Sequence, residues 1–273
     1  MMMKRLLYVL IGSNVMTFTK SYTKLNYINQ YKTRRYISTC SLAMSPSSYP
    51  TNDNIKRSSG LLRRFISKRN STTSTDSQYI KNVMYLWVEK FVFGLKLCPF
   101  SGSVLADNKM NIYVSHDGDD DKGLQNIFEY IVSESEFIMN NNKNEDDRHS
   151  TTLLVLSSST WSDFENYLQL VEDVEELLVN SKLDTGIQVA SFHPSYIFAD
   201  TEETSVDNFT NRSPYPCLHL LKVDEVTKAI ASYGDTKMIY ENNIKRMRKM
   251  GIKKIMQINE EISKDAKNRS SSS

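Results

Sequence analysis

Acidic residues are almost absent from the first part of this sequence. Residues 1–77 contain 13 Lys or Arg but only two acids, Asp53 and Asp76. A basic segment that is also rich in Ser, Thr and Tyr is typical of an organellar transit peptide. We therefore expect 1–77 to be a targeting leader and linker, largely disordered, that directs the chain to a mitochondrion or a plastid. The alternative is a cytosolic protein with a disordered basic arm.

The rest of the chain lacks an excess of positive charge. Residues 78–273 hold 21 basic and 30 acidic residues, which gives a formal charge of −9. A nucleic-acid-binding domain needs a clustered Lys/Arg surface to neutralise phosphates. The composition therefore predicts no nucleic-acid partner.

Cysteines and long apolar runs are also scarce. The three cysteines, Cys40, Cys98 and Cys217, show no CxxC pair and no zinc-type His/Cys spacing. A disulfide framework is not expected, and a reducing compartment fits better. The apolar run 6–11 is far too short to span a bilayer, so we expect a soluble domain without a membrane span. Glycine-rich phosphate loops and the GxSxG elbow are absent as well, which leaves nucleotide-loop and α/β-hydrolase mechanisms without support.

What is present is an alternation of helical and strand patterns. The periodicity predicts helices over about 78–98, 124–139, 162–180, 224–232 and 240–250, and strands over 111–115, 152–156 and 187–192. This order predicts an α/β or α+β fold, a single layered domain of short strands covered by about five helices. We expect the domain to occupy 78–251, between the leader and a charged, Ser-ending tail, 252–273, and we expect the polar run 140–150 to be a solvent loop.

The first expected helix bears on Cys98. Its apolar stripe recurs at three- and four-residue steps up to Leu95 and Cys98, and Pro99 ends it. At the C-terminal end of a helix the dipole disfavours a thiolate. We therefore expect Cys98 to be a buried, unreactive thiol.

Three sequence blocks carry a family resemblance. They are 97–100 (LCPF), 188–198 (QVASFHPSYIF) and 207–221 (DNFTNRSPYPCLHLL), to which Trp87 and Glu89 add. Together they closely resemble an uncharacterised family known as domain of unknown function 1415, over about 78–251. The resemblance implies a domain boundary and marked positions, but no reaction. The chain departs from the family pattern at Cys217, where Met is usual, and at Lys222, where Arg is usual, and 140–150 looks inserted.

The block from 193 to 219 holds the candidate functional residues. Here His193 leaves a strand, and Pro214 and Pro216 stiffen the segment around Tyr215. Stiff polar loops on a rigid scaffold are common binding sites. The sequence therefore predicts either one polar pocket that binds a small anionic metabolite, with possible acid–base catalysis, or a structural cap. The candidate catalytic residues are His193, His219 and Asp207, and the candidate substrate-binding residues are Arg212, Asn211, Ser213 and Tyr215.

Two other functions remain open on the sequence. One is a non-enzymatic domain that binds a protein partner through aromatic anchors, namely Tyr196, Phe198, Phe209 and Tyr215. The other is a metal-dependent enzyme in which His193 and His219 are ligands, although no HxxxH or HExxH spacing supports it. Convergence of His193, Arg212 and His219 on one cavity would favour the first function over both.

Overall fold

The computed structural model describes residues 74–140, 149–231 and 236–271. The leader up to residue 73 and most of the run 140–150 lie outside these residues. Residues 79–271 belong to one compact unit. Its strands are β1 (Met110–Ser115), β2 (Thr151–Leu156), β3 (Ile187–Phe192) and β4 (Cys217–Lys222). Its helical elements are α5 (Ser74–Leu86), the π-helix η1 (Trp87–Phe93), α6 (Ser101–Ala106), α7 (Asp121–Asn140), the 3-10 helix η2 (Ser159–Ser162), α8 (Phe164–Asn180), the 3-10 helix η3 (Val206–Thr210), α9 (Val223–Ala231) and α10 (Thr236–Ser271).

The four strands form one mixed sheet in the order β1-β2-β4-β3. β1 and β2 are parallel, and β4 runs antiparallel to both of its neighbours, β2 and β3. The predicted class, a single layered domain of short strands and helices, is confirmed. β4 was not predicted as a strand. Because this central strand is covered on both faces, its run Cys217–Lys222 is apolar without clear alternation.

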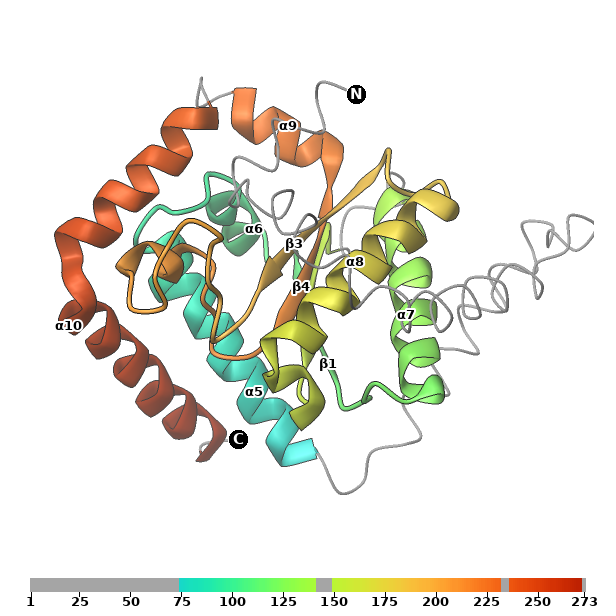
Figure 1. Ribbon diagram of the computed structural model, residues 1–273, viewed down its shortest axis with the longest axis horizontal. Helices are drawn as coiled ribbons and strands as arrows, with labels where there is room; N and C mark the ends of the chain where they lie inside the picture. Colours follow the sequence, from blue (N-terminus) through green and yellow to red (C-terminus); the bar gives the residue numbers. More distant parts are fainter. Residues whose placement is uncertain (1–73, 141–148, 232–235, 272–273) are drawn as a thin grey trace, which may run out of the picture. The chain divides into compact units, whose positions relative to one another are not determined.

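Helices cover both faces of the sheet (Figure 1). On one face, Leu153 and Val155 of β2 join a core cluster with the buried side chains of α5, η1 and α10. On the other face, α7 reaches β2 through the Glu134 carboxylate, which accepts a hydrogen bond from Thr152. α8 lies on the same face, where the Tyr167 hydroxyl donates to the Cys217 carbonyl. The packing of two helical layers on one sheet gives the domain two separate interior regions.

The first long helix differs from its predicted form. It begins at Ser74, within the expected linker, and changes at Trp87 into a π-helix that ends at Phe93. Only glycine fits at position 94, because a Cβ there would lie 2.3 Å from the Lys90 carbonyl oxygen. Lys96 then adopts a φ of 52°, and the chain turns away. The predicted end at Cys98 is therefore wrong, and Cys98 lies in the following turn instead of on the helix.

The second half of α10 replaces the expected tail. α10 kinks at Gly251, where φ is 70° and ψ is 162°, and continues to Ser271. Ile255 and Ile262 of this half are buried in the core cluster with α5, and Asp265 forms an ion pair with Lys90. Figure 1 shows the second half running beside α5. The segment 252–271 is therefore part of the packed domain, outside which the sequence analysis had placed it.

α8 begins at Phe164, two residues after the predicted start at 162, because Asp163 caps it and accepts from the backbone N–H groups of Glu165 and Asn166. Among the described residues, no helix combines the length and the apolar character that a bilayer crossing requires.

Candidate functional site

The floor of the main cavity is a small region of the sheet around Ala190. In the β3–β4 ladder, Gln188 lies opposite Leu221, Ala190 opposite His219, and Phe192 opposite Cys217. Leu153 of β2 in turn lies opposite His219. Side chains alternate between the faces of a sheet, so Gln188, Ala190 and Phe192 share one face. Because Ala190 has the smallest side chain of the three, space remains above the middle of this floor.

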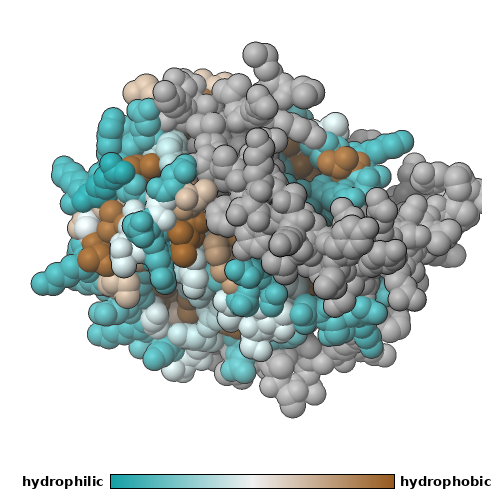
Figure 2. Space-filling view, viewed as in Figure 1, coloured by the Kyte–Doolittle hydropathy of each residue, from teal (hydrophilic) through white to brown (hydrophobic). Residues whose placement is uncertain are grey.

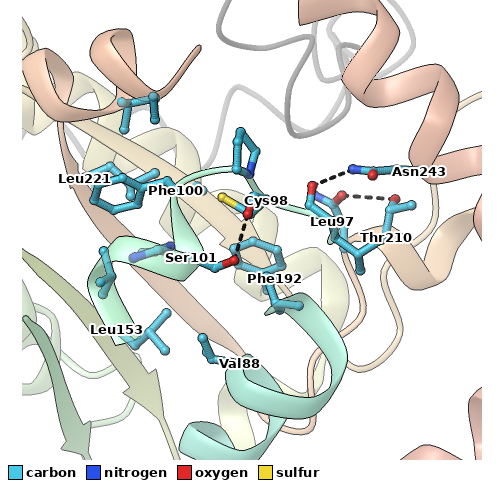
Figure 3. A pocket seen from close by; sticks show the side chains of 18 of the residues that line it. Val88, Leu97, Cys98, Phe100, Ser101, Leu153, Phe192, Thr210, Leu221 and Asn243 are labelled. Carbon is cyan, nitrogen blue, oxygen red and sulfur yellow. Dashed lines mark hydrogen bonds between the residues drawn. The ribbon is translucent and has the colours of Figure 1, made fainter. Parts of the chain in front are cut away.

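The other walls of the cavity come from helices and a turn that precede the strands in the sequence and from helices that follow them. η1 contributes Trp87, Val88 and Val92, and the turn 97–100 with α6 covers the next part. α9 and α10 close the remaining side, and the Asn243 amide of α10 donates to the Leu97 carbonyl at 2.7 Å. Figure 3 shows these side chains around the hollow, with Cys98 between Phe100 and Phe192. The cavity volume is about 100 Å³, on the scale of the ~150 Å³ cavity known to hold benzene.

The lining is mainly apolar and carries no formal charge. No Lys, Arg, Asp or Glu is among the described residues that line it. Its polar members include His219, Asn211 and Asn243, and two further polar atoms of the lining, Trp87 Nε1 and Gln188 Oε1, are buried without a partner in the described residues. A mainly apolar cavity with a small number of placed polar groups is the usual form of a small-molecule site.

His219 presents one unprotonated ring nitrogen. Its Nε2 lies 2.7 Å from Thr151 Oγ1, and the same hydroxyl donates its only hydrogen to the Leu220 carbonyl, also at 2.7 Å. Thr151 Oγ1 must therefore accept from His219, which places the proton on Nε2. Burial lowers the pKa of His219 to about 4, so the ring is neutral near pH 7. Nδ1 is thus a hydrogen-bond acceptor, and no residue in the described part of the chain bonds to it.

Two further polar atoms of the lining are buried without partners. Trp87 is 2% exposed, and its indole Nε1 donates to no group of the described residues. Gln188 Oε1 accepts no hydrogen bond from them. Leaving such groups unpaired costs about 1–3 kcal/mol each. In native proteins most buried polar groups are satisfied, so these two atoms are exceptions among the groups of the lining.

Cys98 also borders the cavity, and its environment differs from the predicted one. Burial raises the pKa of the thiol, while hydrogen bonds from the backbone N–H groups of Phe100 and Ser101 lower it in part. The net effect is a raised pKa, so the group is a poor thiolate. The predicted burial is met only in part, because Cys98 is half-buried in the turn before α6 and does not lie on a helix stripe. The low reactivity stays a prediction, and desolvation of the thiol supports it. Cys217 is fully buried, and burial raises its pKa to about 12.

His193 lies on the opposite face of the sheet from His219. Its Nε2 contacts the Trp161 carbonyl at 2.9 Å, and its Nδ1 accepts from the Ser195 backbone N–H at 3.0 Å. Its ring packs against Phe164 and Tyr167 of α8. Both ring nitrogens of this fully buried histidine are hydrogen-bonded to backbone groups, so it has a structural role at the end of β3.

Arg212 and Asp207 also have structural partners. The Arg212 guanidinium donates to the carbonyls of Tyr196 and Glu203 and stacks over Phe209, 4.9 Å from the ring centroid. Asp207 forms a bidentate pair with Arg248 of α10, at 3.0 and 2.7 Å. Neither residue lines the cavity, so the structure does not bring His193, Arg212 and His219 together.

The other predicted binding residues divide between the cavity and the loop that supports it. Asn211 lines the cavity, and its amide donates to the Ser191 carbonyl at 3.3 Å. Ser213 donates to the Tyr215 carbonyl at 2.6 Å, which fixes the proline-stiffened turn, and neither residue is in the lining. Of the seven predicted site residues, the cavity therefore receives His219 and Asn211.

The geometry also bears on the two alternative functions. Tyr196, Phe198 and Phe209 are at most 6% exposed, so they pack inside the domain and offer no exposed anchors. On the face shown in Figure 2, apolar side chains of the described residues form small separate spots among hydrophilic ones along the edge followed by α10. For a metal site, His193 and His219 are separated by the sheet, and the described residues contain no cluster of three or more potential ligands.

The fold and the cavity define an α/β domain with a cavity of about 100 Å³ between the sheet and its helices. The chain belongs to the family described as protein of unknown function (DUF1415), whose model matches residues 79–257. Neither the curated proteins nor the solved structures contain a match to the chain. All three sequence blocks of the resemblance contribute to the cavity lining, through Leu97–Phe100, through Gln188, Ala190 and Phe192, and through Thr210, Asn211, His219 and Leu221.

Trp87 and Gln188 are two polar residues of the lining that the sequence analysis did not predict as site residues. A signal for Gln188 was present, because strand alternation places it with Ala190 and Phe192 and away from His193. A polar residue on an otherwise apolar strand face marks a position that needs a buried partner. For Trp87 the sequence offers only an apolar helical stripe, in which an indole N–H is not distinguished from any other core contact.

Proposed function

We propose that this domain binds a small, uncharged molecule in the cavity over Ala190, and that His219 is its principal polar contact. The observation that carries the proposal is the neutral, Nε2-protonated His219, whose free Nδ1 borders an apolar cavity. The expected anionic metabolite is replaced by an uncharged one, because the described lining residues include no cation and Arg212 is bound elsewhere.

The role of His219 in this proposal is recognition. A base acts best when its pKa is near the working pH, and a pKa of about 4 makes His219 a weak proton acceptor at neutral pH. Acid–base turnover would need a bound substrate that raises this pKa by developing negative charge beside the ring. Binding through Nδ1 needs no such change.

The proposal is tested by filling the cavity. Ala229 of α9 lines it, whereas Ala231 of the same helix is exposed. A library of neutral fragments is screened on the full chain by ligand-observed NMR, and the hits are repeated on two variants. We expect Ala229→Leu to lower the affinity of the hits at least about tenfold, since the added side chain occupies the ligand's space, and Ala231→Leu to leave it unchanged.

Two results would contradict the proposal. One is a screen without any hit on the unmodified chain. The other is a set of hits that bind equally well to Ala229→Leu, which would locate their site outside the cavity.

A further inference from the structure

The middle of α10 concentrates positive charge in an otherwise acidic domain. The stretch 242–259 holds six basic residues and no acid, whereas the rest of 78–273 holds 15 basic and 30 acidic residues. Segregation of charge on this scale produces a local positive field although the net charge is negative. A cluster of four to eight Lys or Arg on a helix is typical of a surface that contacts an anionic partner.

Three lysines near the kink of α10 supply most of the uncompensated charge. Arg248 is paired with Asp207 and is neutralised by it. Lys249, Lys253 and Lys254 are exposed, and no ion pair links them to an acid in the described part of the chain. Their three positive charges are therefore available to an anionic surface.

Two apolar side chains project beside these lysines. Ile252 is 48% exposed and Met256 is 45% exposed, and they lie one turn apart on the same flank of the helix. Gly251 at the kink is open, because a Cβ placed there would meet no atom within 4 Å. Figure 1 shows the kink at the outer edge of the domain, and Figure 2 shows apolar spots among hydrophilic side chains along that edge. Residues 249–256 thus form a projecting basic ridge.

The shape and the chemistry of the basic ridge suit a bilayer better than a protein segment or a nucleic acid. An extended or helical peptide binds in a groove or along a sheet edge, whereas the ridge projects, and none of its residues lines the cavity. A nucleic-acid backbone would use the lysines but would gain nothing from Ile252 and Met256. An anionic bilayer offers a negative surface to the lysines and an apolar layer beneath it to these two side chains.

We propose that the basic ridge, residues 249–256, is a peripheral docking surface for a bilayer that carries anionic phospholipids. Lys249, Lys253 and Lys254 contact the headgroups, and Ile252 and Met256 enter the apolar layer below them. The inference is independent of the proposed function, because the ridge and the cavity share no residue.

The contribution of charge is tested by co-sedimentation of the full chain with vesicles. We expect binding to vesicles of phosphatidylserine and phosphatidylcholine, little binding to phosphatidylcholine alone, and a loss of binding at high salt. Replacing Lys249, Lys253 and Lys254 together by Gln should lower the affinity about hundredfold, or about fivefold for each lysine. The same three positions replaced by Arg should keep the affinity of the unmodified chain, because the charge is retained.

Exposed lysines outside the basic ridge provide a control with the same change of net charge. The control carries Lys122→Gln, Lys182→Gln and Lys228→Gln, all at exposed positions of other segments. We expect this variant to bind anionic vesicles within about threefold of the unmodified chain, since screening limits the reach of distant surface charges.

The contribution of the apolar pair has its own variants. Ile252→Ser combined with Met256→Ser should lower the affinity about tenfold, whereas Val179→Ser, at a side chain of α8 that is 54% exposed, should leave it unchanged. Insertion is followed in Met256→Trp with vesicles whose acyl chains are brominated. The tryptophans at 87 and 161 are each 2% exposed, so we expect the quenched fluorescence to come from position 256.

Several results would overturn the proposal. One is equal binding to neutral and anionic vesicles, and another is an equal loss of binding in the two lysine triples. Binding of polyglutamate or of a DNA duplex as tight as that of the anionic vesicles would assign the basic ridge to an acidic protein or to a nucleic acid. Unquenched fluorescence of vesicle-bound Met256→Trp would show that the apolar pair does not enter the bilayer, which also contradicts the proposal.

Discussion

At the scale of single residues, the domain holds several polar groups in places where burial changes their chemistry. Burial lowers the pKa of His219 to about 4 and also lowers that of His193, although the Trp161 carbonyl opposes the second shift. Glu134 behaves differently. Burial alone would raise its pKa, but hydrogen bonds from His149, Thr152 and Asn111 bring it below the ordinary value. Acidification therefore affects the stability through His219 below about pH 6.5 and through Glu134 below about pH 4.5.

The His219 shift predicts a defined loss of stability on acidification. The folded-state pKa is about 4 and the ordinary value is 6.5, so the unfolded chain binds more protons between these values. The contribution of neutral His219 is complete above about pH 6.5 and is lost as the pH falls toward 4. The full loss is on the order of 3 kcal/mol. In His219→Gln, the free energy of unfolding should fall less between pH 7 and 5, as measured by urea titrations.

His116 provides the matched control, because it is an exposed histidine. The variant His116→Gln should keep the pH profile of the unmodified chain. A His219→Gln profile that runs parallel to the unmodified one over pH 7 to 5 would show that His219 does not titrate in this way. The stability that the ionised Glu134 contributes is lost only below about pH 4.5, outside this range.

Gln188 predicts a gain of stability when its unpartnered buried acceptor is removed. Replacing it by Met keeps the length of the side chain and removes a buried acceptor that has no partner in the described residues. The free energy of unfolding without ligand should rise by about 1 kcal/mol. Thermal and urea unfolding measure this, with the exposed Gln125→Met as the control, for which no gain is expected. A loss of stability in Gln188→Met would mean that Oε1 has a hydrogen-bond partner in solution.

At the scale of elements, the π-helix and the kinked helix α10 shape the cavity wall. η1 widens the end of the first long helix, and its first two residues, Trp87 and Val88, both reach the lining. π-helical segments are rare and often occur at functional sites. α10 supports this wall from outside, since its second half buries Ile255 and Ile262 in the cluster that contains Trp87 and Val88.

Support of the cavity wall by α10 predicts a large effect of Ile262. This side chain is 1% exposed, and its truncation to Ala leaves a core void. We expect Ile262→Ala to lower the free energy of unfolding by about 2–4 kcal/mol, as for other large-to-small core changes. Ile252 of the same half is 48% exposed, so Ile252→Ala should change it by less than about 0.5 kcal/mol. Equal effects of the two variants in urea titrations would show that 252–271 is not packed on the domain in solution.

At the scale of the whole molecule, the sequence predicted the layers but not the grouping of the functional residues. β3 was predicted with its observed bounds because Gly186 precedes it and a β-branched pattern follows. The first helix was misjudged, since an apolar period continues through Leu95 and Cys98 after the helix has ended. Convergence of His193 with His219 was expected because the two histidines flank one polar loop. The face of the sheet to which each side chain points depends instead on its position in the alternation along β3 and β4. Once 217–222 is recognised as a strand paired with β3, the two histidines fall on opposite faces.

The most direct measurement of the central claim is the tautomer of His219 with and without a bound fragment. The sequence has four histidines, so a long-range ¹H–¹⁵N spectrum of the full chain resolves few ring signals, and His219→Gln assigns the one of interest. The account predicts a protonated Nε2 and an unprotonated Nδ1 at neutral pH, and a change of the Nδ1 signal when a neutral donor fragment binds. Protonation at Nδ1, or an Nδ1 signal unaffected by every fragment that binds the chain, would contradict it.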